Sequence, residues 1–362
     1  MDRRAFIATA AAGAFAPSAR AATPDASPAW VKLPTEPYRG KQDDVYFVDE
    51  TTGWYGNGAG KLFRTTDGGQ SWTRQLERPG TFVRALGFVD GSLGFLGNIG
   101  PDYFPDVSDP VPLYRTRDGG ESWEPVTIAG PAVKGICAID VYREPFINAG
   151  VLDHRVTLRA AGRVGSPAFL ATSHDRGETW SSEDLSPHTA MILDVGFVNE
   201  QVGFICGASS GRIQESHAVV LRTGDGGRTW SRVYESARPW ELTWKMSWPS
   251  EKVGYVTLQN TNRDAPVPQQ RLLKSIDAGL TWVELPMVED ARARPFGVGF
   301  VDELRGWVGT ATGGLETNDA GATWKPAPMG LAVNKVRATR KRDGGRAVFA
   351  IGTELHRLDL PA

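Results

Sequence analysis

One eight-residue pattern, Ser/Thr-x-Asp-x-Gly-x-Ser/Thr-Trp, recurs six times along the 362 residues of this chain, and we call each copy an octapeptide turn. Successive tryptophans of these turns lie 51, 57, 50, 52 and 42 residues apart. A period near 50 residues fits one four-stranded blade of a β-propeller per copy, so the repeat predicts an all-β ring. The copies are Thr65 to Trp72, Thr116 to Trp123, Ser173 to Trp180, Thr223 to Trp230, Ser275 to Trp282 and Thr317 to Trp324.

The residue types within each octapeptide turn indicate a structural role. An Asp side chain accepts hydrogen bonds from backbone N–H groups of its own turn, and Gly tolerates a positive φ. Each turn carries only one or two carboxylates, whereas calcium takes six or more oxygen ligands, so we predict neither catalysis nor metal binding there. The predicted structural residues are Asp67, Asp118, Asp175, Asp225, Asp277 and Asp319, with Trp72, Trp123, Trp180, Trp230, Trp282 and Trp324.

A second pattern, Phe-Val-Asp/Asn followed by a Gly-aromatic pair, precedes most octapeptide turns. It predicts the two inner strands of a blade, while the octapeptide turn joins the two outer strands. The third repeat departs from this pattern and carries an inserted stretch around Arg143 to His154. The copies are Phe47-Val48-Asp49 with Gly53-Trp54, Phe88-Val89-Asp90 with Gly94-Phe95, Phe197-Val198-Asn199 with Gly203-Phe204, Phe300-Val301-Asp302 with Gly306-Trp307, and the looser Trp248-Pro249-Ser250 with Gly254-Tyr255.

A seventh repeat without an octapeptide turn lies at the C-terminus, where residues 336–340 and 347–352 supply inner strands. The chain then ends before an outermost strand. Residues 29–34 resemble residues 281–286, which follow the fifth octapeptide turn. We therefore predict a seven-bladed propeller of four-stranded antiparallel blades over residues 22–362, closed by an N-terminal strand that joins the C-terminal blade. A six-bladed ring is the alternative.

The two cysteines, Cys137 and Cys206, each lie in an apolar strand-like run. Cysteine packs as a small hydrophobic residue, so two buried free thiols are expected. Export of the chain would also permit a disulfide between them, and the sequence leaves that alternative open.

The first 21 residues predict an export leader. Asp2-Arg3-Arg4-Ala5-Phe6-Ile7 resembles the twin-arginine signal, and an Ala-rich apolar run leads to a small-x-small cleavage site at Ala19-Arg20-Ala21. We therefore expect a periplasmic protein exported by the twin-arginine route. No apolar stretch long enough for a membrane span follows the leader. The mature chain carries a formal charge of −4, which argues against general nucleic-acid binding.

Candidate binding residues follow from the propeller architecture. The loops that enter each innermost strand, and those between the second and third strands, converge around the central channel on the rim opposite the octapeptide turns. Alignment on the Phe-Val-Asp copies places Asp43 and Phe296 at this mouth. Arginine and aromatic residues on one face suit recognition of proteins or carboxylates. The candidates for binding are Arg84, Tyr103, Trp244, Lys245, Arg263 and Arg294.

No cofactor or metal site is predicted. The sequence contains no dinucleotide fingerprint, paired-cysteine motif or haem motif. Its five histidines lack the spacing of metal ligands.

The octapeptide turns resemble the Asp-box, or BNR, repeats of several propeller families. With seven blades and an export leader, the chain looks most like the photosystem II stability/assembly factor family and its bacterial relatives. The paired pattern that carries this resemblance is typified by residues 83–90 leading to residues 113–123. It implies a non-enzymatic, chaperone-like factor that binds a protein partner, such as a subunit of a membrane complex. Whether the source organism is photosynthetic, and the oligomeric state, are left open by the sequence.

The alternative is an Asp-box glycoside hydrolase, because sialidases and xyloglucanases carry similar repeats. A sialidase resemblance would need an early Arg-Ile-Pro motif, which is missing from the sequence. Xyloglucanases pair two propellers and need two facing carboxylates, whereas this chain has one propeller. The carboxylates that would have to supply such a pair are Asp43, Asp44, Asp102, Asp106 and Asp264.

Overall fold

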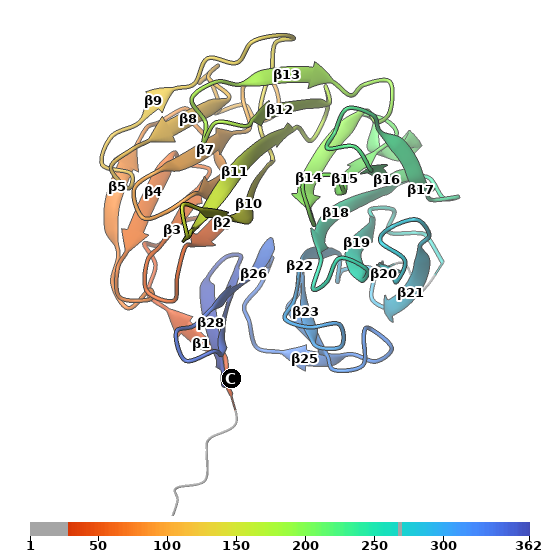
Figure 1. Ribbon diagram of the computed structural model, residues 1–362. Coiled ribbons are helices and arrows are strands. Elements are labelled where there is room, and N and C mark those ends of the chain that lie inside the picture. Colours follow the sequence, from red (N-terminus) through yellow and green to blue (C-terminus); the bar gives the residue numbers. More distant parts are fainter. Residues whose placement is uncertain (1–27, 267–269) are drawn as a thin grey trace, which may run out of the picture.

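The computed structural model describes residues 28–266 and 270–362, and these residues form seven four-stranded antiparallel sheets arranged as a ring (Figure 1). Blades 1 to 3 comprise β2 (Gln42–Phe47), β3 (Gly53–Asn57), β4 (Lys61–Thr65) and β5 (Thr73–Glu77); β6 (Val83–Phe88), β7 (Gly94–Asn98), β8 (Leu113–Thr116) and β9 (Glu124–Pro125); and β10 (Ala138–Asn148), β11 (Val151–Gly162), β12 (Phe169–Ser173) and β13 (Ser181–Asp184).

The remaining four blades continue round the ring in chain order (Figure 1). Blades 4 and 5 comprise β14 (Met191–Phe197), β15 (Gly203–Ala208), β16 (Ala218–Thr223) and β17 (Ser231–Glu235), then β18 (Glu241–Ser247), β19 (Gly254–Asn260), β20 (Gln270–Ser275) and β21 (Val283–Val288). Blades 6 and 7 comprise β22 (Pro295–Phe300), β23 (Gly306–Thr310), β24 (Gly314–Thr317) and β25 (Lys325–Ala327), then β26 (Lys335–Arg340), β27 (Arg346–Ile351), β28 (Leu355–Leu360) and β1 (Val31–Leu33). A 3₁₀ turn, η1 (Ile213–Glu215), lies between β15 and β16.

The antiparallel order gives the ring two distinct rims. Turns between the first and second strands lie on the same rim as the octapeptide turns, and we call this the octapeptide rim. The connections that enter each first strand, and those between second and third strands, lie on the opposite rim, which we call the mouth rim. Successive antiparallel strands reverse direction, so every blade contributes to both rims in the same way.

The octapeptide turns share one hydrogen-bond pattern, which is illustrated by blade 1. The Thr65 hydroxyl donates to Asp67 Oδ1 (2.7 Å) and accepts the N–H of Gly69 (2.9 Å). The Asp67 carboxylate also accepts the N–H (2.9 Å) and the hydroxyl (2.5 Å) of Ser71, and these bonds lower the pKa of Asp67. The predicted turn-fixing role of the Asp is therefore visible as hydrogen bonds within eight residues. The same bonds are made by Asp118, Asp175, Asp225, Asp277 and Asp319.

Aromatic rings fill the seams between blades. The Trp54 ring stacks on Phe88 of the next blade, with a centroid distance of 3.6 Å, and Trp123 meets Phe88 edge-on at 6.3 Å. A Cβ on Gly94 would lie only 2.2 Å from the Phe88 ring, so glycine is what lets that ring lie flat against the backbone. The Gly-aromatic pair in the sequence thus encodes a packing site. Equivalent stacks join Phe204 to Trp248, Tyr255 to Phe300 and Phe349 to Phe47.

The two ends of the described chain share blade 7. Strand β1 pairs antiparallel with β28, in the position of an outermost strand. Trp30, just before β1, packs edge-on against Trp307 of blade 6 with a centroid distance of 5.9 Å. Between blades 7 and 1, the N–H of Gln42 donates to the carbonyl of Gly352 (2.7 Å). The prediction of seven blades is confirmed, and the N-terminal strand completes the last sheet as expected.

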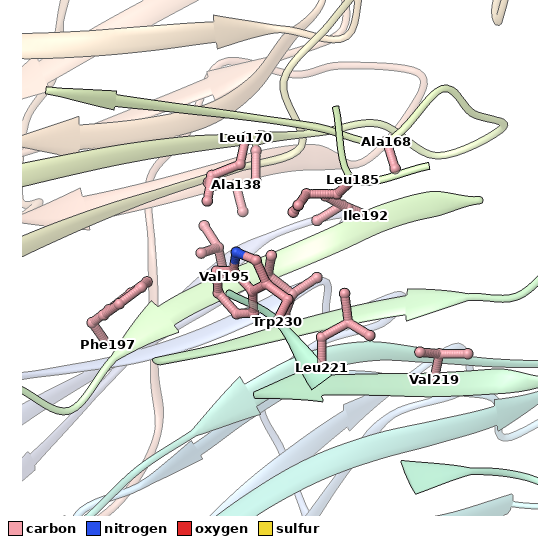
Figure 2. Close-up of a cluster of buried hydrophobic side chains, with 12 residues drawn as sticks. Ala138, Ala168, Leu170, Leu185, Ile192, Val195, Phe197, Val219, Leu221 and Trp230 are labelled. Carbon is pink, nitrogen blue, oxygen red and sulfur yellow. The ribbon is translucent and has the colours of Figure 1, made fainter. Parts of the chain in front are cut away.

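Blade 3 carries the inserted stretch that the sequence indicated. Strands β10 and β11 have 11 and 12 residues, and their register runs from Ala138–Ala161 out to Asn148–Val151. The insertion is therefore an extension of the inner hairpin, on the octapeptide rim. Packing between blades 3 and 4 is apolar, as Figure 2 shows for the cluster that contains Ala138, Leu170, Ile192, Val195 and Trp230, among others.

The two cysteines are free and buried, which confirms the expectation of separate thiols. The expected leader, residues 1–21, lies outside the described residues. In the described part of the chain, no helix has the length and hydropathy that a membrane span requires.

Candidate functional site

Side chains from four blades meet at the channel on the mouth rim, and we call Lys41, Asp43, Arg84, Trp244 and Asn334 the mouth network. Arg84 forms a buried ion pair with Asp43. Asn334 donates to the backbone carbonyl of Asp43 (2.8 Å) and accepts from Lys41 Nζ (3.0 Å) and from Trp244 Nε1 (3.3 Å). Residues almost 300 positions apart in the chain are thus tied together at this end of the channel.

Aromatic rings and cationic side chains lie next to each other in and beside the mouth network. Trp244 and Phe296 pack with centroids 5.4 Å apart. Lys41 Nζ lies 5.8 Å from the Trp244 ring and 5.2 Å from the Phe296 ring, and the Arg294 guanidinium lies 5.9 Å from Phe296. Burial lowers the pKa of Lys41 to about 8, although Asp43 acts in the opposite direction. Cations at this distance from aromatic faces are attracted by the ring quadrupole.

Tyr103 lies on the loop between β7 and β8, with 41% of its surface exposed. Its ring packs edge-on against Phe104 at 4.7 Å, and Phe104 stacks on Phe82 at 5.0 Å. A Cβ on Gly165 would lie 2.7 Å from the Tyr103 ring, and Gly165 has a positive φ of +80°. The loops of blades 2 and 3 therefore hold Tyr103 at a defined place on the mouth rim.

A cavity of about 300 Å³ lies inside the channel, along the inner strands of several blades. Its wall includes Asp194 and Lys245, whose Nζ lies 3.3 Å from Asp194 Oδ1 and donates to the Leu193 carbonyl (2.5 Å). Its wall also includes Asp140, and burial raises the pKa of this carboxyl to about 7 despite the neighbouring Arg159. The cavity is polar and lined by charges of both signs.

The Asp44 carboxylate, which is fully buried at the channel, accepts from Lys335 and from the Arg337 guanidinium. Burial opposes ionisation of Asp44, but Arg337 and Lys335 outweigh it and lower its pKa. Asp43 and Asp44 are therefore both ion-paired with basic side chains inside the ring. Asp102, Asp106 and Asp264 lie exposed on mouth-rim loops.

The sequence-predicted candidates fall into three groups. Arg84 and Lys245 are buried, with 4% and 3% of their surfaces exposed, and both are ion-paired inside the ring. Trp244, a member of the mouth network, and Arg294, which lies beside it near Phe296, are partly buried. Tyr103 and Arg263 are exposed on loops between second and third strands, on the same rim.

Lys41 and Asn334 are central to the mouth network and were not among the predicted binding residues. Lys41 lies one residue before β2, and Asn334 lies one residue before β26. Both positions are where a chain enters an innermost strand, so a loop-entry rule applied to every blade would have found them. Blade 7 lacks the Phe-Val-Asp pattern, so the alignment had no anchor there.

Comparison with known proteins gives a local match in sequence and a similar fold over most of the chain. No family model matches the chain. Over 90 residues, 23% of this chain and 23% of the relative, it is 38% identical to the Photosystem II assembly lipoprotein Ycf48 of Synechococcus sp. (strain CC9902). The matched segment therefore spans less than a quarter of that curated relative.

Two solved structures of the same kind match almost the whole ring. The structure of YCF48 bound to D1 peptide covers 92% of this chain and 96% of its own, with a TM-score of 0.60 and 16% identity. YCF48 from Cyanidioschyzon merolae covers 91% and 98%, with a TM-score of 0.60 and 15% identity. The predicted resemblance to the photosystem II assembly factor is thus confirmed, as local sequence similarity and a shared propeller fold.

A glycoside hydrolase of family GH74, from Niastella koreensis, also shares the fold. It matches 88% of this chain but only 52% of its own length, with a TM-score of 0.56 and 15% identity. At such identity the likeness concerns the fold alone, because one fold hosts many functions. Among the described residues, no group of three or more His, Cys, Asp or Glu side chains is placed to hold a metal ion.

Proposed function

We propose that this chain is a non-enzymatic, protein-binding propeller that assists the assembly of a membrane or periplasmic protein complex. The observation that carries the proposal is the 38% identity to the assembly lipoprotein Ycf48, together with the shared fold of a YCF48 solved with a D1 peptide. The matched segment covers only 23% of this chain. We therefore describe the partner by the chemical groups that the mouth rim could bind.

The mouth rim supplies a surface suited to a protein segment. Trp244, Phe296 and Tyr103 present aromatic area, and Lys41 and Arg294 place cations beside it. Aromatic residues and arginine are enriched at the centres of protein interfaces, and arginine binds carboxylates through a planar fork. We expect the partner to contribute a carboxylate, from a side chain or a C-terminus, next to an apolar side chain.

A binding experiment tests this surface. Purified protein is used to capture a partner from membrane extract. The affinity of the captured partner is then measured for the natural chain and for the variant Arg294→Glu. Arg292→Glu is the matched control, because Arg292 lies two residues away, is highly exposed and is paired with Asp290. Loss of binding at least tenfold greater for Arg294→Glu than for Arg292→Glu supports the mouth rim as the binding surface. Unchanged binding of the Arg294→Glu variant would place the binding surface elsewhere.

Export to the periplasm is part of the proposal and rests on residues 1–21 alone. A twin-arginine signal depends on both arginines of its motif. Replacing Arg3 and Arg4 with lysine should therefore retain the protein in the cytoplasm, as measured by cell fractionation. Periplasmic recovery of this variant at the level of the natural chain would reject the twin-arginine route.

The glycoside hydrolase alternative is tested with the same purified protein, incubated with aryl glycosides and xyloglucan. We expect no turnover, because Asp43 and Asp44 are held by Arg84, Lys335 and Arg337. Turnover that disappears in Asp102→Asn would overturn the non-enzymatic proposal.

A further inference from the structure

The cavity inside the channel lies toward the octapeptide rim. Its volume of about 300 Å³ is at the lower end of the range for small-molecule pockets, about 300–1,000 Å³. Its wall includes Tyr46 and Phe197, near or at the ends of β2 and β14, and Trp248, just after β18. First strands run from the mouth rim to the octapeptide rim, so the cavity and the mouth network occupy different parts of the channel.

Blade 7 supplies a basic wall, on which Lys335 and Arg337 share one carboxylate. Both side chains form ion pairs with the fully buried Asp44, so two cations face a single anion. The hydrogen bonds from Arg337 to Asp44 use Nε and Nη2, not Nη1, and are 3.3–3.4 Å long. Arg337 also keeps 32% of its side-chain surface exposed. Its Nη1 is therefore available to a second acceptor in the cavity.

The titration of Lys335 agrees with an excess of positive charge at this wall. Burial lowers the pKa of Lys335 to about 7, and Lys245 and Arg337 act in the same direction, against the opposing effect of Asp44. A further anion beside Lys335 would favour its charged form.

Blade 3 supplies an acidic wall, on which the proportions are reversed. The buried Arg159 lies between two carboxylates, 3.7 Å from Asp140 Oδ2 and 3.9 Å from Glu200 Oε2. The Arg159 guanidinium has no hydrogen-bond partner among residues 28–266 and 270–362, and Asp140 Oδ2 is buried and equally unpartnered there. Asp140 still keeps 17% of its side-chain surface exposed, so Oδ1 is the oxygen that reaches the cavity.

The charges between these two walls cancel, because Lys245 Nζ lies 3.3 Å from Asp194 Oδ1. Arg337 lowers the pKa of Asp140 from across the channel, so the two walls are close enough to interact. In the part of the chain that the structure describes, the ion pairs of Asp140 and of Arg337 are made with other partners, Arg159 and Asp44. The cavity is therefore dipolar, with a basic side and an acidic side that no side chain connects.

We propose that this cavity binds a small zwitterion of the amino-acid class, which has one ammonium group and one carboxylate. The ligand carboxylate accepts hydrogen bonds from Arg337 Nη1 and Lys335, and the ammonium group donates to Asp140 Oδ1. Such a ligand adds an anion where two cations share one carboxylate, and a cation where two carboxylates share one guanidinium. It brings no net charge into the channel, whereas a simple anion or cation would compensate one wall alone. The inference is independent of the proposed function, which uses the mouth rim.

Isothermal titration calorimetry of the purified protein tests the ligand class. The probes are glycine, β-alanine, γ-aminobutyrate and δ-aminovalerate, in which the ammonium group and the carboxylate lie progressively farther apart. We expect saturable one-to-one binding that is tightest at one chain length. Propionate and propylamine each carry one of the two charges and should bind at least tenfold more weakly. The proposal is overturned if none of the four zwitterions binds, or if propionate binds as tightly as the best of them.

Two variants test the walls separately. Arg337→Gln leaves Lys335 to pair with Asp44, and Asp140→Asn removes one of the two carboxylates beside Arg159, so each should lower the affinity for the best probe about tenfold or more. Arg340→Gln, on the same strand as Arg337, and Asp153→Asn, on the same strand pair as Asp140, change exposed residues outside the cavity and are the matched controls.

The controls should bind like the natural chain, and urea denaturation should show that every variant compared is folded. Because the two walls are changed in separate proteins, either variant gives a result if the other fails to fold. Unchanged affinity in a folded Arg337→Gln or Asp140→Asn protein would overturn the proposal, as would equal losses in the controls.

Discussion

Carboxylates on the two rims of this propeller are stabilised by different kinds of partner. On the octapeptide rim, each Asp is satisfied within eight residues, as Asp118 is by Thr116 and Ser122. On the mouth rim and in the channel, a carboxylate such as Asp43 depends on Arg84 from the next blade and on Asn334, 291 residues away. The local hydrogen bonds of the octapeptide turns recur along the sequence, whereas the contacts of Asp43 require several blades to be assembled into the ring.

This difference between the two rims shows which charged groups depend on contacts between blades. A turn that binds its own carboxylate depends on contacts within eight residues, so the loss of that carboxylate affects one turn alone. A buried ion pair assembled from several blades is strongly destabilised when one partner is removed, because the other charge stays buried without compensation. The largest effects of substitution should therefore lie at the mouth and the smallest at the octapeptide turns.

The largest expected effect is that of Arg84→Met. It leaves the Asp43 carboxylate, with 1% of its surface exposed, without its main cationic partner. We expect a loss of about 3–5 kcal/mol in the free energy of unfolding, measured by urea denaturation. Adding Asp43→Leu to the same chain should recover part of that loss. A loss below about 1 kcal/mol would show that the mouth network is not stabilised as a unit.

An intermediate effect is expected at Asp140, in the channel. Burial raises the pKa of this carboxyl to about 7 in the folded state, against about 3.9 in the unfolded chain. The folded state then binds more protons between these values, so Asp140 favours folding at low pH and this contribution is lost as the pH rises through 7.

The variant Asp140→Asn removes that titration. Relative to the natural chain, it should show a smaller loss of stability between pH 4 and pH 8. Urea denaturation at several pH values measures this difference. Parallel pH profiles for the two proteins would show that Asp140 does not titrate in this range.

The smallest effect is expected at a single octapeptide turn. Asp118→Ala removes bonds to Ser122 and Thr116 that lower the pKa of Asp118 to about 2. The turn is exposed, so we expect a loss of about 1 kcal/mol at neutral pH. Since the folded pKa is depressed, this contribution is present above pH 4 and disappears as the pH falls toward 2, where the natural and variant proteins should melt alike. A loss as large as that of Arg84→Met would erase the contrast between the rims.

The fold could be predicted from the sequence because its determinants are local and repeated. The octapeptide turns gave the period, the Gly-aromatic pairs gave the inner strands, and the likeness of residues 29–34 to residues 281–286 gave the strand that completes blade 7.

The candidate site was only partly predictable. Alignment placed Trp244 and Arg294 at the mouth, but it did not reveal that Arg84 and Lys245 are ion-paired inside the ring. That pairing depends on contacts between blades, which have no sequence period. Asn334 was missed for a different reason, because its blade lacks the inner-strand pattern on which the alignment depends.

Protein binding at the mouth rim is most directly tested by cross-linking from a defined position. A photo-activatable residue is placed at Trp244 on the mouth rim and, as a control, at Leu280, which is exposed in the octapeptide turn of the same blade. In membranes of the source organism, the first protein should cross-link to a discrete membrane-complex subunit, and the second should not. Cross-links to that subunit from Leu280 but not from Trp244 would contradict binding at the mouth rim.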